Sequence, residues 1–206
     1  MAAIITESIG IQGFEVVANR IGSILAEEIA NQQAIQGFEE DVELYLERIE
    51  PFSKEQDVMI TTAFREASYE GQTTRDSQGQ YIYFIDVFCS GMGEGDISPS
   101  IIAKNKLFRY VGLVRYILSS GKYLTLGLPP GLIGGKYIEK ITIDTDYSNF
   151  GNHSNYDGSF IRFARIIFRV RVQENQLLWE GVEMQGNTTN VTLDNTGEGT
   201  RLIFNN

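Results

Sequence analysis

Apolar residues recur at helical spacing in two stretches of this 206-residue chain. In Ile9–Gln36 they follow three- and four-residue steps, Gly37 is a suitable C-terminal stop, and Gly22 predicts a close-packed neighbour. A second helix is predicted at Pro99–Ser119, because Ser98 is a good N-cap and proline is tolerated at the first helical position. The positions predicted to face the core are Phe14, Val17, Ile21, Ile24, Leu25, Ile29, Ala103, Leu107, Tyr110, Val111, Val114, Ile117 and Leu118.

Other stretches have the two-residue period that indicates β-strands. Tyr81–Ser90 is apolar on both faces apart from Asp86, which predicts a central place in the sheet and a buried, inert Cys89. A polar loop is expected at Tyr69–Gln80 and an exposed connection at Leu124–Gly135. The remaining predicted strands are Val42–Glu50, Asp57–Ser68, Tyr137–Tyr147, Ser159–Gln173 and Leu177–Gln185.

The longest predicted strand, Ser159–Gln173, changes its pattern halfway. Ile161 and Phe163 occupy odd-numbered positions and share one face. Ile166, Phe168, Val170 and Val172 occupy even-numbered positions and share the other face. Because successive side chains of a strand point to opposite faces, this change predicts a β-bulge near Ala164–Arg165. The arginines of the strand are predicted to line an outer face of the sheet, and an ordinary hairpin arm with solvated arginines is the alternative.

These elements predict an α+β fold, with a mixed, mainly antiparallel twisted sheet flanked by two α-helices and followed by a β-rich C-terminal extension. Residues 1–175 are assigned to one domain and residues 176–206 to the extension. Val191–Leu193 and Leu202–Phe204 have short β-like patterns in a segment too polar for a core of its own. We therefore expect the extension to dock elsewhere as an arm.

The charge balance narrows the classes of partner. The formal net charge is −10, whereas wrapping a nucleic acid requires a surplus of Lys and Arg to neutralise phosphates. This balance argues against tight DNA or RNA binding.

No apolar run approaches the roughly 20 residues that a membrane-spanning helix needs. The single cysteine excludes an internal disulfide framework and fits a reducing compartment.

The spacings of known catalytic or metal sites are not reproduced. Gly91–Gly95 precedes a predicted helix, where a phosphate loop would lie, but Asp96 occupies the place of the third glycine of a dinucleotide fingerprint. Asp144–Asn149 is only faintly similar to a calcium loop and is interpreted as turns. The only histidine, His153, is expected on the surface, whereas a Cys–His dyad would need Cys89 at its side. We therefore predict no enzymatic activity, no cofactor and no metal.

The order of these elements resembles a known family. An amphipathic helix, an antiparallel group of strands, a helix with a basic side and a long Arg-rich strand are similar to the tail-terminator (tail-completion) proteins of tailed bacteriophages and the related joining rings at the head–tail neck. The likeness covers roughly Ile9–Gln173, and the extension after Asn175 departs from the simplest members. The segments that carry it are Phe14–Ile29, Val42–Pro51, Tyr81–Cys89, Leu107–Leu118 and Phe160–Val172.

The resemblance implies a virion protein, assembled in the host cytoplasm, that forms a ring at the head–tail junction. The ring, commonly of six copies, would cap the tail-tube protein and join it to the head connector. Six copies at −10 each would carry about −60, so DNA would pass through the lumen without specific binding.

A closed ring needs two different patches that meet between neighbouring copies. We predict that an arginine set of one copy faces an acidic set of the next. The arginines are Arg162, Arg165, Arg169 and Arg171, and the acids are Glu39, Glu40, Glu43 and Glu47. The loops predicted to dock partner proteins contain Arg75, Asp76, Asn152 and His153.

Three alternatives remain open from the sequence. The first is another neck or tail-tube ring protein of the same virion. The second is a β-rich carbohydrate-binding or adhesin module, and the third is an enzyme of an unrecognised type. The aromatic residues considered for a sugar platform are Tyr81, Tyr83, Tyr137 and Trp179, for most of which packing in the core or an interface is the default.

Overall fold

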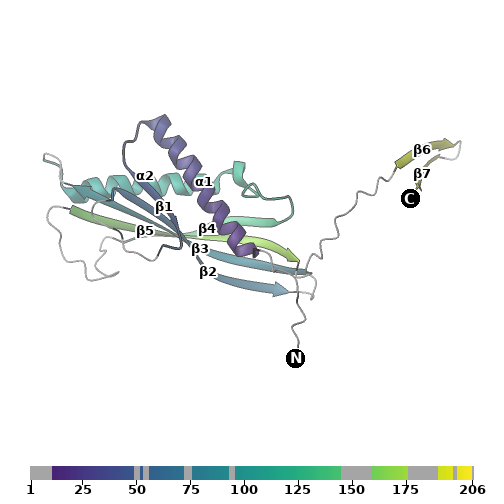
Figure 1. Ribbon diagram of the computed structural model, residues 1–206, viewed down its shortest axis with the longest axis horizontal. Coiled ribbons are helices and arrows are strands. Elements are labelled where there is room, and N and C mark those ends of the chain that lie inside the picture. Colours follow the sequence, from purple (N-terminus) through teal and green to yellow (C-terminus); the bar gives the residue numbers. More distant parts are fainter. Residues whose placement is uncertain are drawn as a thin grey trace, which may run out of the picture. The chain divides into compact units, whose positions relative to one another are not determined.

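Two helices lie on one face of a five-stranded sheet (Figure 1). The computed structural model describes residues 11–48, 52, 56–71, 76–92, 96–144, 159–175, 190–196 and 199–205. Neighbouring strands are antiparallel, except that β1 and β2 are parallel, and the order is β1-β2-β3-β5-β4. The predicted α+β fold is thus confirmed. The elements are α1 Gly13–Gln36, β1 Val42–Leu46, β2 Val58–Gly71, β3 Asp76–Met92, α2 Pro99–Ser119, η1 Gly121–Tyr123, β4 Ile133–Asp144 and β5 Ser159–Asn175.

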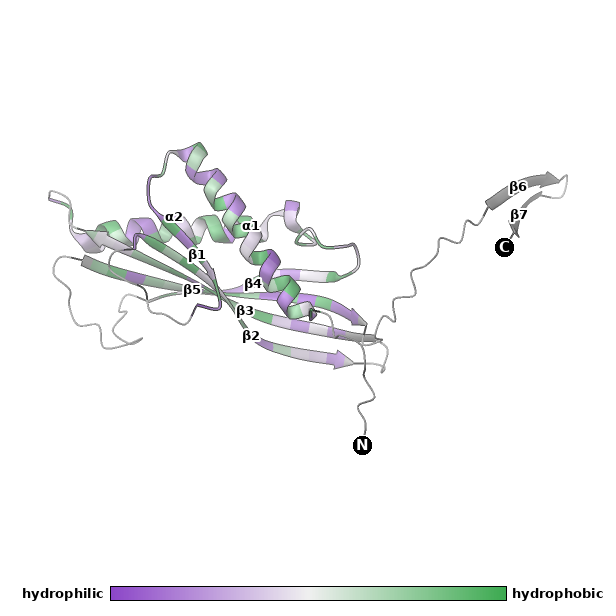
Figure 2. Cartoon of the chain, in the orientation of Figure 1, coloured by the Kyte–Doolittle hydropathy of each residue, from purple (hydrophilic) through white to green (hydrophobic). Residues whose placement is uncertain are grey.

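Both helices begin and end close to the predicted positions. Gly37 ends α1 in the left-handed conformation, with φ of 69°, and its N–H donates to the carbonyl of Gln33 at 2.9 Å. A Cβ on Gly22 would lie 2.8 Å from Leu46 Cδ2, so the predicted close neighbour is β1. Helix α2 starts at Pro99, as predicted. Both helices contain interspersed hydrophobic and hydrophilic residues (Figure 2), and the buried hydrophobic ones pack on the sheet.

The core lies between the helices and β3, which occupies the predicted central place. Five side chains of β3 that face the helices are fully buried: Tyr81, Tyr83, Ile85, Val87 and Cys89. Burial raises the pKa of the Cys89 thiol above its ordinary value, so the thiolate is disfavoured. The prediction that Cys89 is a buried small hydrophobe is confirmed.

The predicted bulge at Ala164–Arg165 is wrong. The ladder between β3 and β5 runs from Ser159 to Asn175 without a register shift. Phe163 instead lies on the face opposite to Ile166, where its ring contacts Phe88 with the centroids 4.8 Å apart. The apolar residues of β5 change from odd to even positions because both faces of the sheet are apolar near Phe163. Register shifts occur instead in β2, between Phe64 and Glu66, and at two places in β4, between Ile133 and Gly135 and between Ile138 and Lys140.

Two predicted connections are partly strand. Most of the expected loop Tyr69–Gln80 belongs to a long β-hairpin, since β2 runs to Gly71 and β3 begins at Asp76. The expected exposed connection Leu124–Gly135 contains Leu126, which is fully buried, and the first residues of β4. Polar side chains hide the two-residue period at the ends of β2 and β3, because exposed ladder positions accept polar residues on both faces. At the start of β4 the period is hidden by Gly134 and Gly135.

A carboxyl at the end of β5 lies against the core. Glu174 is half-buried and accepts a hydrogen bond from the Tyr81 hydroxyl. Burial raises the pKa of Glu174 above its ordinary value, because the charged form loses hydration. The folded state therefore favours the neutral acid more than the unfolded state does, and this contribution to stability is lost as the pH rises through the raised pKa.

Replacing Glu174 with Gln is expected to make the protein relatively more stable at high pH. The melting temperature of Glu174→Gln minus that of the wild type should grow between pH 4 and pH 8, measured by circular dichroism. Glu15→Gln is the control, because Glu15 is exposed on α1. A difference that stays constant with pH would show that the Glu174 carboxyl is not destabilised by burial.

The chain divides into two compact units, Met1–Asn175 and Gln176–Asn206. In the second unit, β6 (Asn190–Thr196) and β7 (Gly199–Asn205) form an antiparallel pair. The short β-like pieces expected from the sequence lie within these strands. The predicted strand Leu177–Gln185 lies outside the described residues, and docking of the extension stays a prediction.

Candidate interaction surfaces

The face of the sheet opposite to the helices is called the open face here. In the described part of the chain, only Phe52 of the β1–β2 connection stacks on it, with its ring 5.7 Å from that of Phe88. Phe52 is 4% exposed, so it covers the aromatic end of the open face. Same-face residues alternate along each strand, and the other open-face residues include Met59, Thr61, Ala63, Glu66, Ile82, Phe84, Asp86, Tyr137, Lys140, Thr142, Phe163, Arg165, Ile167, Arg169 and Arg171.

An ion pair lies in the middle of the open face. Arg165 stands directly opposite Asp86 on the neighbouring strand and binds it through two hydrogen bonds, of 2.8 Å from Nε and 2.7 Å from Nη2. Only 12% of the Asp86 side chain and 31% of the Arg165 side chain are exposed. The guanidinium also lies 4.6 Å from the centroid of the Phe84 ring. Thr61 and Thr142 stand opposite the two partners on the outer strands, so this fixed, bidentate pair belongs to a polar band beside the apolar Ile82, Phe84 and Ile167.

A second bidentate pair lies nearer to the edge strand β4. Arg169 donates to Glu139 at 2.6 Å from Nε and 3.1 Å from Nη2. Glu139 occupies the irregular position of β4, between Ile138 and Lys140. The hydrogen bonds from Arg169 hold the pKa of the Glu139 carboxyl below its ordinary range. Arg169 is therefore engaged within its own chain.

The four predicted interface arginines do not share one surface. Arg162 points to the helix side, where its Nη2 donates to Ser100 Oγ at 3.1 Å. Arg165 and Arg169 form the two pairs described above, and Arg171 is exposed. The contact of the arginine set with a neighbouring copy stays a prediction, and Arg171 is its most accessible member.

The predicted acidic residues also make contacts within the chain. Glu40 accepts from Arg109 Nη1 at 2.7 Å and from the Tyr110 hydroxyl at 3.3 Å. Glu43 lies 3.5 Å from Arg48. The Glu47 carboxylate accepts the N–H of Phe64, and Glu39 is exposed.

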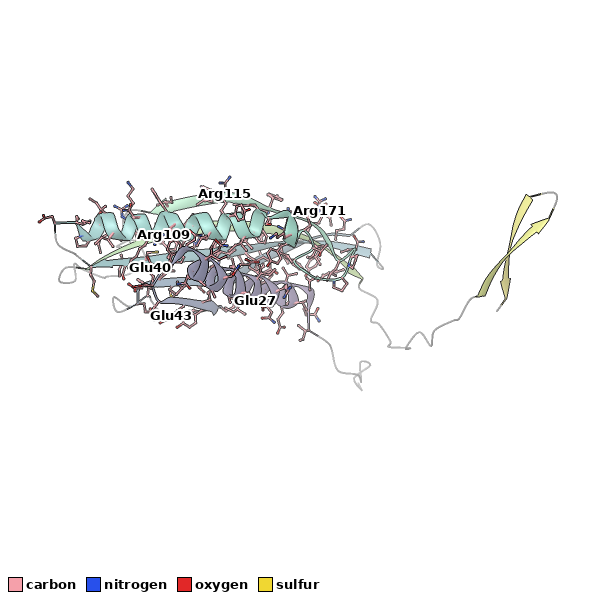
Figure 3. All side chains as sticks on the ribbon, turned by 90° about the horizontal axis from the view of Figure 1, so that it is seen from above. Glu27, Glu40, Glu43, Arg109, Arg115 and Arg171 are labelled. Carbon is pink, nitrogen blue, oxygen red and sulfur yellow. The ribbon has the colours of Figure 1, made fainter. Side chains whose placement is uncertain are left out.

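Charge divides between α2 and the segment that follows α1. Helix α2 contains four basic residues and no acidic residue, whereas residues 39–47 contain five acidic residues and no basic one. Where the two elements meet, Arg109 and Glu40 lie side by side, and Arg115 lies on another side of α2 (Figure 3). Sequence reasoning noted the basic side of this helix but did not use it for an interface.

Several predicted site residues cannot be placed. Arg75, Asn152 and His153 lie outside the described residues, and Asp76 is the first residue of β3 rather than a loop residue. Among the described side chains, no group of three or more His, Cys, Asp and Glu could hold a metal ion. No described helix is long and apolar enough to cross a membrane.

The sugar platform considered from the sequence does not form as expected. Tyr81 and Tyr83 are fully buried in the core, and the Tyr83 hydroxyl donates to the Phe14 carbonyl at 2.7 Å. Tyr137 is 53% exposed, and Trp179 lies outside the described residues. Two of the four aromatic residues are thus unable to contact a ligand.

The pairing of Asp86 with Arg165 was missed because the two residues are 79 positions apart. The only signal in the sequence was one acid in an otherwise apolar strand. The chain matches no protein-family model and no curated protein. Inference about its function therefore depends on the open face and on the division of charge.

Proposed function

We propose that this chain is a structural protein of a tailed bacteriophage that forms a ring at the head–tail junction. The ring caps the tail tube and joins it to the head connector. The family resemblance gives the proposal its biological setting. It implies a mixed sheet with two helices, which agrees with the fold of the first unit.

The open face is the observation that carries the proposal. Strands β2, β3 and β5 have 14 to 17 residues, compared with about 5–6 in an average strand. On the open face, Ile82, Phe84 and Ile167 remain only half-buried. An antiparallel sheet that faces water on one side normally places polar residues there. A long surface with an apolar strip and fixed ion pairs is typical of a protein contact.

The net charge fits a channel through which DNA passes. Each copy carries −10, so a ring of copies repels a polyanion from its lumen, at least at distances within the Debye length. DNA is expected to move past the ring without specific binding.

The first test is the size of the protein in solution and its effect on tail-tube protein. Light scattering coupled to size exclusion should give a closed oligomer, about 139 kDa for six copies of the 23.1-kDa chain. Added to tail-tube protein that is polymerising, the chain should stop growth and shorten the tubes seen by negative-stain electron microscopy. Incorporation along the tube would instead favour a tube protein.

A matched pair of variants tests the role of the open face. Tyr137 on the open face and Leu124 in the α2–β4 connection are 53% and 68% exposed, so Glu at either position should leave folding intact. Tyr137→Glu should lose tube capping, whereas Leu124→Glu should cap like the wild type. Equal capping by both variants would remove the open face from the proposed contact, and no effect of the wild type on tubes would refute the capping function.

A further inference from the structure

The outer side of α2 carries apolar and basic residues at helical spacing. Ile101 and Phe108 are 51% and 49% exposed, and Lys104 and Arg115 are exposed beside them. The steps of three, four and seven residues place all four on one side of the helix. Lys104 Nζ lies 5.5 Å from the centroid of the Phe108 ring, so the charge and the ring form one patch. These four residues are called the basic stripe.

The basic stripe is distinct from the cations that α2 uses inside the chain. Lys106 binds Asp57 at 2.9 Å, and Arg109 binds Glu40 at 2.7 Å. These two pairs lie on the side of α2 that faces the acidic residues 39–47. The basic stripe points elsewhere, and Arg115 is seen on another side of α2 from the Arg109–Glu40 pair (Figure 3).

A second patch also combines an exposed apolar residue with exposed charged residues, but its charges are negative. Ile35, Glu39 and Asp41 are exposed around the end of α1, with Ile35 68% exposed. These three residues are called the acidic turn. The Gln33 carbonyl accepts the N–H groups of residues 37 and 38, and its side-chain amide donates to the Glu40 carbonyl at 2.7 Å. The acidic turn is therefore held in one shape before any partner arrives.

We propose that the basic stripe of one copy binds the acidic turn of the next copy, and that this contact closes the ring. The inference rests on the proposed ring function. Each patch combines an exposed apolar side chain, Phe108 or Ile35, with exposed charged residues, which are basic in one patch and acidic in the other. Such complementarity orients two partners and selects against wrong ones. The two patches are different, so the contact is heterologous and joins copies head to tail.

A second copy fits the basic stripe better than a nucleic acid does. Binding to DNA gains affinity from each phosphate that a cation neutralises. The basic stripe offers two cations, Lys104 and Arg115, on a chain with net charge −10. Its exposed Ile101 and Phe108 need an apolar partner, which the phosphate backbone does not supply.

Two charge-reversed variants test the contact. Lys104→Glu with Arg115→Glu makes the basic stripe negative, and Glu39→Lys with Asp41→Lys makes the acidic turn positive. All four side chains are exposed, so unchanged circular dichroism spectra and melting temperatures are expected. By sedimentation at low ionic strength, each variant alone should associate about 100-fold more weakly than the wild type, since like charges then face each other.

Mixing the variants gives the sharper result. Each has one intact and one reversed patch, and the two reversed patches have opposite charges, so a 1:1 mixture should form the ring again with the two variants alternating. The variant with all four changes has exchanged the signs of both patches and should form the ring again. A carbodiimide that joins amines to carboxyls should link Lys104 of one wild-type copy to Glu39 or Asp41 of an isotope-labelled copy, alone and on tail-tube ends.

The outcomes separate this contact from the ring itself. Rings that form equally well in both variants would overturn the contact and leave the proposed function standing. A wild type that stops at a dimer would overturn the heterologous geometry. A wild type without intermolecular links, alone or on tubes, would overturn the contact, as would binding of duplex DNA that is lost on reversal of Lys104 and Arg115.

Discussion

Asp86→Ala is expected to lower the free energy of unfolding by about 3 kcal/mol, because it removes the two charge-assisted hydrogen bonds that Asp86 accepts from Arg165 in a largely dehydrated site. The carboxylate accepts two hydrogen bonds from Arg165, and 12% of its side chain is exposed. Arg165 keeps 31% of its side-chain surface in water, which places the loss at the lower end of the range for buried pairs. Urea unfolding followed by circular dichroism measures the change.

The matched control is the other bidentate pair. Glu139→Ala also removes a carboxylate that binds an arginine fork, but 40% of the Glu139 side chain is exposed, and the expected loss is below about 1 kcal/mol. Replacing both partners, Asp86→Leu with Arg165→Met, should recover most of the stability, since neither charge then remains uncompensated. Equal losses for Asp86→Ala and Glu139→Ala would show that burial does not set the strength of the central pair.

Elements with local signals could be predicted from the sequence. The start of α2 follows from Ser98 and Pro99, and the end of α1 follows from Gly37, because these residues act on their own backbone. The central place of β3 follows from its apolar residues on both faces. The close contact at Gly22 also follows, because glycine inside a helix is unfavourable without a packing reason.

The open face could not be predicted, because its contacts join distant residues. Phe163 is apolar because Phe88 lies beside it and Phe52 covers that ring, and no local pattern reports these contacts. The same apolar residue was therefore interpreted as evidence for a bulge. Ion pairing has a similar limit, because only the strand order places Asp86 opposite Arg165 and Glu139 within reach of Arg169.

Gly91→Ala is expected to lower the free energy of unfolding by about 3 kcal/mol through overpacking. A Cβ at this position would lie 2.2 Å from the Pro99 carbonyl oxygen and 2.7 Å from the Ala103 nitrogen. Both atoms belong to the backbone of α2, so a side-chain rotation cannot relieve the clash. The first turns of α2 would therefore have to move away from β3. The melting temperature should fall by roughly 6–12 °C for a chain of this size.

Gly112→Ala is the matched control, because Gly112 lies in the same helix and a Cβ there would meet nothing within 4 Å. This substitution should stabilise the protein by up to about 1 kcal/mol, since alanine has a higher helix propensity than glycine. From the sequence, Gly91 begins a glycine-rich link, and a flexible link would tolerate alanine. A melting temperature of Gly91→Ala equal to that of the wild type would favour the flexible link and show that α2 does not need its close approach to β3.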